Sequence, residues 1–309
     1  MTLFSLIFAL LLEQWRPAGD RNRFILLFLS YADALERYFN TGVRRHGVAA
    51  WMAAVVPVLI VTGWIYYLLY SLNPLLAWAW NVVMLYFTMG FRQFIYSFAE
   101  IKDALKNDDL LLARKLLREW GGMRADELSS GEISRITIEL ALIHSHRYVF
   151  GIIIFFVGLP GPLGPVLYRL AELLSKRWSG PGKQERESDA FGHFAAKAFE
   201  LIDWLPARST AVSFAIAGNF EDAVYCWRAQ AASWMDEAQG IILASGAGAL
   251  GVRLGDSLRE AGGKYYRPEL GVGEEADMDF LQSTVGLIWR TLVLWLLLLL
   301  LLEITSWAA

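Results

Sequence analysis

The sequence has 309 residues, of which 56% are hydrophobic and 19% are charged, and its formal net charge is −3. So small a charged fraction is unlike a typical soluble domain, and the near-neutral balance argues against nucleic acid as a partner. The single cysteine, Cys226, excludes an intramolecular disulfide framework and a cysteine-based zinc cluster. The composition predicts an integral membrane protein in which Cys226 is packed inside a helix.

The first apolar segments predict a short helix and then a hairpin that crosses the membrane twice. Residues 1–17, MTLFSLIFALLLEQWRP, lack the basic start and the cleavage site of a signal peptide, so we expect a short membrane-embedded or interfacial helix. Residues 48–72 carry no charge and are long enough to span a bilayer, and residues 75–91 are a shorter apolar run. Because Asn73 and Pro74 signal a turn between them, we predict a transmembrane hairpin over residues 48–91.

Residues 98–147 predict cytoplasmic helices, because Lys and Arg concentrate on the cytoplasmic side of membrane spans. These cations flank the hairpin on both sides, at Arg37, Arg44, Arg45, Lys102, Lys106, Arg114, Lys115, Arg118 and Arg124. Asn107 or Asp108 is expected to begin one helix as its cap, and Gly121 and Gly122 are expected to end it.

The helix that follows is expected to begin at Ser129 or Ser130, with Glu132 in its first turn. His144 and His146 lie near its end, two residues apart. Because residues i and i+2 of a helix do not share a face, the two histidines are not expected to bind one metal ion. The sequence predicts no metal site.

Residues 148–170 form an apolar segment that GLPGPLGP interrupts. Each arm is too short to span the membrane by itself. A kinked span and a re-entrant hairpin are both open, since broken backbone at membrane depth must be covered by protein. The Lys- and Arg-rich stretch from Arg169 to Arg267 favours the re-entrant form, which keeps that stretch cytoplasmic.

Residues 171–284 predict a polar helical region that begins with a charged loop at residues 175–189. Further on, DWLPAR separates two apolar helical runs, because the residue before Pro206 is driven out of helical geometry. Asp203 and Arg208 lie near this break. They are expected either to form an ion pair there or to bind a ligand. Residues 285–307 then predict a C-terminal transmembrane helix, near whose start Arg290 can extend to the surface.

The stretch GAGALGVRLG at residues 246–255 is the most unusual motif of the polar region. No strand precedes it, so a dinucleotide-binding loop is excluded. Its glycines, among them Gly248, Gly251 and Gly255, either allow helices to pack closely or open a helix so that its amides bind an anion. In the second case Arg253 would supply the charge.

Six motifs occur in the order of a known family: ALKNDDLLLARKLL, EISRITIELA, GLPGPLGPVLYRL, LIDWLPARSTA, GALGVRLG and YYRPELG. They resemble the CobD/CbiB family of integral membrane proteins, and the first 17 residues resemble its divergent relative AmpE. The resemblance covers nearly the whole chain. It implies one domain over residues 1–309, an all-α polytopic protein of the inner membrane with cytoplasmic helical segments.

The resemblance also implies an activity. CobD/CbiB proteins are adenosylcobinamide-phosphate synthases, which join an aminoalcohol phosphate to a propionate of the corrinoid adenosylcobyric acid in an ATP-dependent amide synthesis that would use Mg²⁺. In such an enzyme Arg208, Arg253 and Arg267 would bind phosphate or propionate groups, since guanidinium pairs with both. Glu139 and Asp203 would be the remaining carboxylate candidates, and no residue is assigned to catalysis.

Three stretches depart from the family pattern. They are EQWRPAGDRNR near the start, ELLSKRW after the Gly/Pro turn, and the segment before the glycine motif, where Gly240 alone is kept. A second hypothesis therefore stands beside the enzyme: a non-catalytic membrane regulator of the AmpE type, linked to β-lactamase induction, in which these residues hold helices together. The lipid bilayer is a partner in both cases, and a homo-oligomer is left open.

Overall fold

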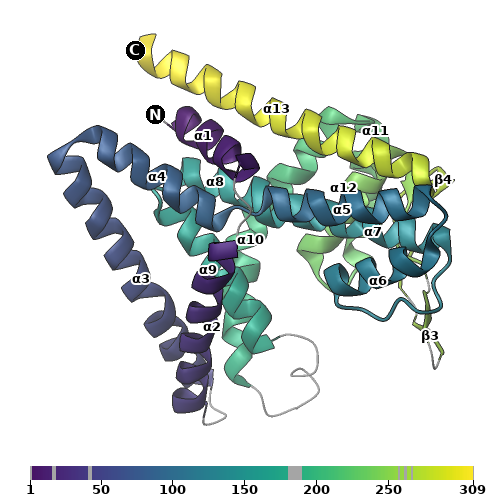
Figure 1. Ribbon diagram of the computed structural model, residues 1–309, viewed down its shortest axis with the longest axis horizontal. Helices are drawn as coiled ribbons and strands as arrows, with labels where there is room; N and C mark the ends of the chain where they lie inside the picture. Colours follow the sequence, from purple (N-terminus) through teal and green to yellow (C-terminus); the bar gives the residue numbers. More distant parts are fainter. Residues whose placement is uncertain are drawn as a thin grey trace. The chain divides into compact units, whose positions relative to one another are not determined.

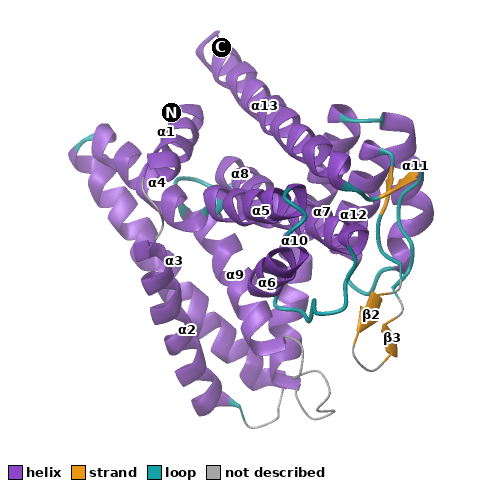
Figure 2. Ribbon diagram, turned by 45° about the vertical axis from the view of Figure 1, so that its right-hand side comes forward, coloured by secondary structure: helices purple, strands orange, loops and turns teal. Residues whose placement is uncertain are grey.

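The computed structural model describes residues 2–15, 19–40, 44–179, 190–256, 258–260, 263–265 and 267–308. Helices dominate these residues, and the strands are short and few (Figure 2). The predicted all-α class is therefore confirmed. Contacts between residues divide the chain into two compact units, one made of Met1–Gly90 and Gly151–Pro206 and the other of Phe91–Phe150 and Ala207–Ala309.

The first unit is built around the predicted hairpin (Figure 1). Its helices α3 (Arg44–Leu72) and α4 (Pro74–Thr88) are joined through Asn73, whose side chain accepts a hydrogen bond from the amide of Leu75 at 2.8 Å. Proline suits the first position of a helix, where its missing N–H leaves no bond unmade. The hairpin turn is thus formed by the two residues that the sequence indicated.

The remaining helices of this unit pack on the hairpin and on one another. They are α1 (Thr2–Trp15), α2 (Gly19–Phe39), α8 (Gly151–Gly158), α9 (Leu163–Ser179) and the first part of α10 (Ala190–Ala217). Helix α1 lies on α4, α8 lies on α9, and α9 contacts α2, α3 and α4. Residues 180–189, most of the loop expected at 175–189, lie outside the described residues.

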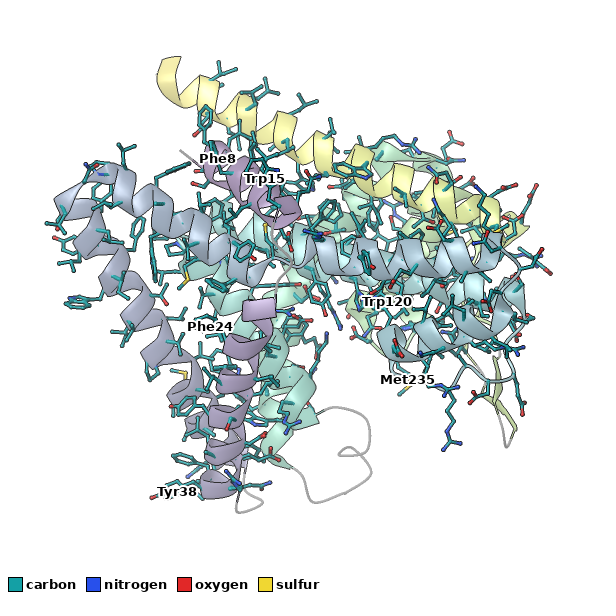
Figure 3. The ribbon with its side chains drawn as sticks, viewed as in Figure 1. Phe8, Trp15, Phe24, Tyr38, Trp120 and Met235 are labelled. Carbon is teal, nitrogen blue, oxygen red and sulfur yellow. The ribbon has the colours of Figure 1, made fainter. Side chains whose placement is uncertain are left out.

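Three helical stretches are long and apolar enough to cross a membrane: Arg45–Leu72, Ser130–Gly158 and Met278–Thr305. Helices α1 and α4 are also apolar but shorter than these three stretches. Large apolar side chains point outward from these helices, as Phe8 and Trp15 on α1 show in Figure 3. Water would make such exposure costly, whereas lipid favours it. The chain is a membrane protein.

The broken segment at residues 148–170 differs from its expected form. A single helical stretch of 29 residues runs from Ser130 to Gly158, through α7 (Ser130–Ser145), the short π-helix η1 (His146–Phe150) and α8. The break falls at Leu159–Pro162, where Gly161 has a φ of 62°. The expectation that each arm is too short to span is thus wrong for the first arm, because that arm continues the helix before it.

The expected break before Pro206 is also wrong. Helix α10 continues from Ala190 to Ala217 with Pro206 inside it, and Leu205 stays helical. Proline removes one backbone hydrogen bond, but the other peptide groups of an apolar helix have no better partner than the helix itself.

The second unit contains α5 (Phe91–Lys106), α6 (Leu110–Gly121), α7, η1, α11 (Phe220–Gln230), the 3₁₀ turn η2 (Ala231–Ser233), α12 (Glu237–Leu250), α13 (Met278–Ala308) and the end of α10. Helix α7 lies at its centre and contacts α5, α6, α12 and α13, while α11 packs along α12. Cys226 is fully buried in α11, as predicted.

The predicted helix ends of this unit agree with the structure, with one exception. Ser129 begins α7 and Gly122 ends α6 in the left-handed conformation. Helix α6, however, is capped by Asp109, not by Asn107 or Asp108. Asp108 has a φ of 55° and therefore belongs to the turn between the two helices.

The region at residues 171–284 is helical only in part. After α12 the chain forms a loop with four short strands: β1 (Val252–Arg253), β2 (Leu258–Glu260), β3 (Gly263–Tyr265) and β4 (Glu274–Glu275). Strand β1 pairs with β4 in parallel, and β2 with β3 in antiparallel fashion. The prediction of a polar helical region over residues 171–284 is therefore wrong for residues 251–277, which are called the 251–277 loop below.

Candidate anion-binding site

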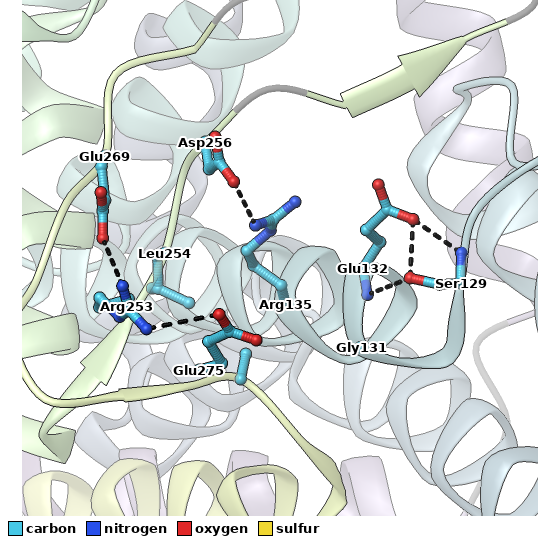
Figure 4. Close-up of a pocket in the computed structure, with 10 residues that line it drawn as sticks. Ser129, Gly131, Glu132, Arg135, Arg253, Leu254, Asp256, Glu269 and Glu275 are labelled. Atoms are coloured by element: carbon cyan, nitrogen blue, oxygen red, sulfur yellow. Dashed lines mark hydrogen bonds and ion pairs between the residues drawn. The ribbon is translucent and has the colours of Figure 1, made fainter.

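A polar cavity of about 390 Å³ lies in the second unit, between the start of α7 and the 251–277 loop (Figure 4). Two arginines and four carboxylates are among its lining residues, which are Ser129, Gly131, Glu132, Arg135, Arg253, Leu254, Asp256, Glu269, Glu275 and Ala276. Both arginines therefore face a space that could hold a small anionic group.

Arg135 reaches the cavity because α7 begins with a capping box. The Ser129 hydroxyl accepts from the Glu132 amide at 3.3 Å, and the Glu132 carboxylate accepts from the Ser129 amide at 2.8 Å. Residue 135 lies one turn after residue 132 on the same face. The Arg135 guanidinium donates to Asp256 at 3.3 Å, and its side chain is mostly buried.

Arg253 reaches the cavity from β1. Pairing with β4 places Val252 opposite Glu274 and Arg253 opposite Glu275, with Val252 buried. The guanidinium of Arg253 contacts Glu269 at 3.5 Å and Glu275 at 3.4 Å (Figure 4). Both distances are long, and the carboxylate side chains are 54% and 89% exposed, so these pairs contribute little to stability.

The arginines retain unused donors. The Nε atoms of Arg135 and Arg253 are buried and have no hydrogen-bond partner among the described residues. Guanidinium groups bind phosphate and carboxylate oxygens through paired N–H donors. The two arginines are therefore held by weak internal ion pairs and keep donors that suit an anionic group, although the lining carries more carboxylates than arginines.

Glu139, Gly255 and Arg267, three residues that the sequence singled out, meet beside this cavity. Arg267 donates to the two oxygens of Glu139 at 2.6 and 3.0 Å, and the Gly255 amide donates to Glu139 at 2.9 Å. The Arg267 guanidinium also lies 5.5 Å from the ring centre of Trp234. These bonds fasten the 251–277 loop to α7, and they engage Arg267 and Glu139 with each other.

Gly255 belongs to this fastening for a steric reason. Its φ is 75°, and a Cβ atom there would lie 2.0 Å from the carbonyl oxygen of Pro268. Only glycine combines this backbone conformation with so close an approach. The amide of the motif thus does receive an anion, but the anion is the protein's own Glu139.

The other glycines of the motif serve packing. Gly248 lies inside α12, where a Cβ would come within 2.4 Å of the Asp222 carbonyl oxygen on α11. Gly251 ends α12 with a φ of 68°, and its amide bonds back to Ala247 and Gly248. Because these residues lie in and at the carboxyl end of a helix, the expected opening of the helix toward an anion is wrong, and close packing is the role of Gly248.

Asp203 and Arg208 belong to different compact units and have separate contacts. Asp203 is buried in the first unit, where it accepts a hydrogen bond from the Tyr168 hydroxyl at 2.7 Å. Arg208 donates to Glu237 at 2.7 Å in the second unit. Neither residue lines the cavity. Each residue thus has a partner on another helix, Asp203 in Tyr168 and Arg208 in Glu237.

Arg135 was missed by the sequence reading. Its signal was present, since an arginine three residues after the capping glutamate lies on the same helix face as the cap. Among the residues that the structure describes, no group of three or more His, Cys, Asp or Glu side chains could hold a metal ion.

Comparisons with known proteins match nearly the whole chain. The family model described as CobD/Cbib protein matches residues 6–288. The protein named cobalamin biosynthesis protein CobD of Stutzerimonas stutzeri strain A1501 is 34% identical over 305 residues, which cover 97% of this chain and 98% of that relative. The protein of the same name from Chromobacterium violaceum is 35% identical over 222 residues, covering 72% of this chain and 70% of the relative. No solved structure gives a significant match.

Proposed function

Because this chain belongs to the CobD/Cbib protein family, we propose that it acts in cobalamin biosynthesis. The relative from Stutzerimonas stutzeri, which carries that role in its name, aligns from end to end, so both compact units lie within the shared region. These relatives lend no support to the alternative of an AmpE-type regulator.

The finer proposal is that the protein joins an aminoalcohol phosphate to a propionate of adenosylcobyric acid. The observation that carries it is the cavity lined by Arg135 and Arg253. Both substrates carry anionic oxygens, which guanidinium groups bind well. With a volume of about 390 Å³, the cavity has room for the phosphate or carboxylate end of a ligand.

The family resemblance implies that this reaction uses ATP and Mg²⁺. The described residues do not form a site that is ready to bind the metal ion. Each carboxylate of the cavity is already engaged: Glu132 in the capping box, Asp256 with Arg135, and Glu269 and Glu275 with Arg253. In this reaction the two arginines would bind the anionic groups of the substrates, and no residue is assigned to catalysis.

The setting of the proposed activity is the inner membrane. Three helical stretches have the length and apolarity of membrane spans, and the polar cavity lies at the amino-terminal end of one of them, Ser130–Gly158. Corrinoid and aminoalcohol phosphate are the proposed partners, and oligomerisation stays a prediction.

Complementation tests the finer proposal. A bacterial strain that lacks its adenosylcobinamide-phosphate synthase, and whose growth depends on cobamide, is given this gene and supplied with cobyric acid. The strain's own synthase and an empty vector are the controls. Growth supports the proposal, whereas no growth despite full-length protein in the membrane fraction contradicts it.

A further inference from the structure

The first unit contains a second cavity, of about 280 Å³, that belongs to no part of the proposed activity. It lies between the start of α1, the second half of α3, the first half of α4 and the turn that follows α8. Four of its lining residues are aromatic and none is charged; the lining residues are Thr2, Tyr66, Tyr70, Pro74, Ala77, Trp78, Asn81, Phe156, Val157, Gly158, Leu159, Pro160 and Gly161.

Asn81 is a polar residue of this uncharged cavity whose acceptor atom lacks a partner among the described residues. Its side chain lies in α4 and lines the cavity, and the residue is 9% exposed. Its Oδ1 atom is buried without a hydrogen-bond partner among the described residues. A buried acceptor without a partner is costly, so its presence points to a ligand that donates an N–H or O–H group.

The aromatic rings around this acceptor favour a positively charged donor. Tyr66 and Tyr70 stack on successive turns of α3 with ring centres 6.2 Å apart. Trp78 is held edge-on by Phe8 at 5.1 Å. Aromatic faces attract ammonium groups, most strongly where water is excluded. No Lys or Arg of the wall would repel such a group.

The surroundings of the cavity favour an ammonium that arrives on a lipid. Helix α3 is a candidate membrane span, and Leu72, Leu75 and Leu76 beside the hairpin turn are exposed. Exposed leucines around a turn between two apolar helices suit contact with acyl chains. An ammonium carried by an amphiphile would thus find apolar surface for its tails next to a polar acceptor.

We propose that this cavity binds the primary ammonium headgroup of a membrane phospholipid, with Asn81 accepting an N–H bond and Tyr66, Tyr70 and Trp78 surrounding the charge. The phosphate of the lipid stays outside, because no cation of the wall could pair with it. This proposal is independent of the cobalamin reaction and of the cavity in the second unit.

The test uses the purified full-length chain, delipidated in detergent and titrated with short-chain phosphatidylethanolamine, phosphatidylcholine or phosphatidylglycerol under native mass spectrometry. The ethanolamine lipid is expected to bind most tightly, since it alone combines the charge with N–H donors. Asn81→Leu is expected to weaken its binding about tenfold or more, the effect of losing a hydrogen bond to a charged group. Thr62→Val removes a buried hydroxyl from α3 outside the cavity and is expected to leave binding unchanged.

Equal binding of the ethanolamine and glycerol lipids by the unaltered chain would overturn the proposal. So would an Asn81→Leu chain that folds and keeps the preference. Tyr70→Leu is the second variant if Asn81→Leu fails to fold, because Tyr70 is exposed and its loss should spare the fold while reducing the preference. Displacement of the lipid by free ethanolamine phosphate at similar concentration would show that a soluble amine, not a lipid, is the occupant.

Discussion

Arg267 holds both carboxylate oxygens of Glu139, and this buried pair ties a loop that follows α12 to the central helix α7. The Gly255 amide completes the set of donors around Glu139. The loop carries Arg253, whereas α7 carries Arg135. The pair therefore maintains the distance between the two arginines of the cavity without contacting a ligand itself.

Breaking this pair from one side is expected to destabilise the second unit. Arg267→Leu leaves the buried Glu139 charge without its cation and with the Gly255 amide as its remaining described donor, a change that costs about 3–5 kcal/mol. Thermal unfolding in detergent, followed by circular dichroism, would measure it. The double variant Glu139→Leu, Arg267→Met should recover much of the loss because no unpaired charge remains. Lys197→Ala breaks an exposed pair with Glu200 and serves as the control that should change little. An unfolding temperature unaltered by Arg267→Leu would contradict the proposed role.

Loss of either cavity arginine is expected to weaken the binding of phosphate- or carboxylate-bearing ligands. Arg253→Gln and Arg135→Gln should each cost about 1.5–3 kcal/mol, roughly 10- to 100-fold in Kd. Calorimetric titration of aminopropanol phosphate and of adenosylcobyric acid would show it. Arg208→Gln is the matched control, since Arg208 pairs with Glu237 away from the cavity. If the unaltered protein binds neither ligand, the finer functional proposal fails; if it binds and the cavity variants do too, the site is elsewhere.

The packing role of Gly248 predicts sensitivity to a single methyl group. In Gly248→Ala the new Cβ meets backbone atoms of Asp222 and Ala223 in α11, which cannot move as a side chain would. We expect destabilisation of roughly 1–3 kcal/mol by overpacking. Gly286→Ala is the comparison, because this glycine lies inside α13 with only an ordinary contact at 3.6 Å. That variant should be neutral or more stable by about 0.5–1 kcal/mol. Similar unfolding temperatures for both variants would show that α11 and α12 do not require the close approach.

The cationic flanks of the α3–α4 hairpin predict that the residues between α6 and α7 face the cytoplasm. A cysteine at the exposed position Glu127 should resist membrane-impermeant thiol reagents in intact cells. Ser71→Cys, at an exposed polar position beside the hairpin turn, should react readily from outside. Both variants are made with Cys226→Ala, although burial, with the charge of Asp222 adding to it, raises the pKa of the Cys226 thiol and keeps it unreactive at neutral pH. Rapid labelling at position 127 would reverse the assigned orientation.

Much of the fold could be read from short stretches of sequence. The all-α class, the hairpin turn at Asn73 and Pro74, the Ser129 cap of α7 and the C-terminal span all follow from signals within a few neighbouring residues. Such signals act through local backbone conformation and apolar periodicity, which are the same wherever the segment lies. The break at Leu159–Pro162 was predicted correctly, but the local sequence misled on Pro206 and on the length of the arm before Leu159. Whether a segment leaves the helix there depends on its surroundings, which the local sequence does not specify.

Which residues come together in the candidate site depends on the tertiary structure. The sequence indicated Glu139, Arg253, Gly255 and Arg267 separately, and it did not reveal that Arg267 is taken up by Glu139 while Arg253 faces a cavity with Arg135. Nor did it reveal that the glycine motif has two parts. Gly248 lies in a closely packed helix, whereas Gly255 lies in a turn and its amide donates a hydrogen bond to the carboxylate of Glu139. A residue type specifies what a side chain can bind. Its actual partner depends on which distant segments the folded chain brings within hydrogen-bonding distance, because a buried charge must find a partner among those neighbours.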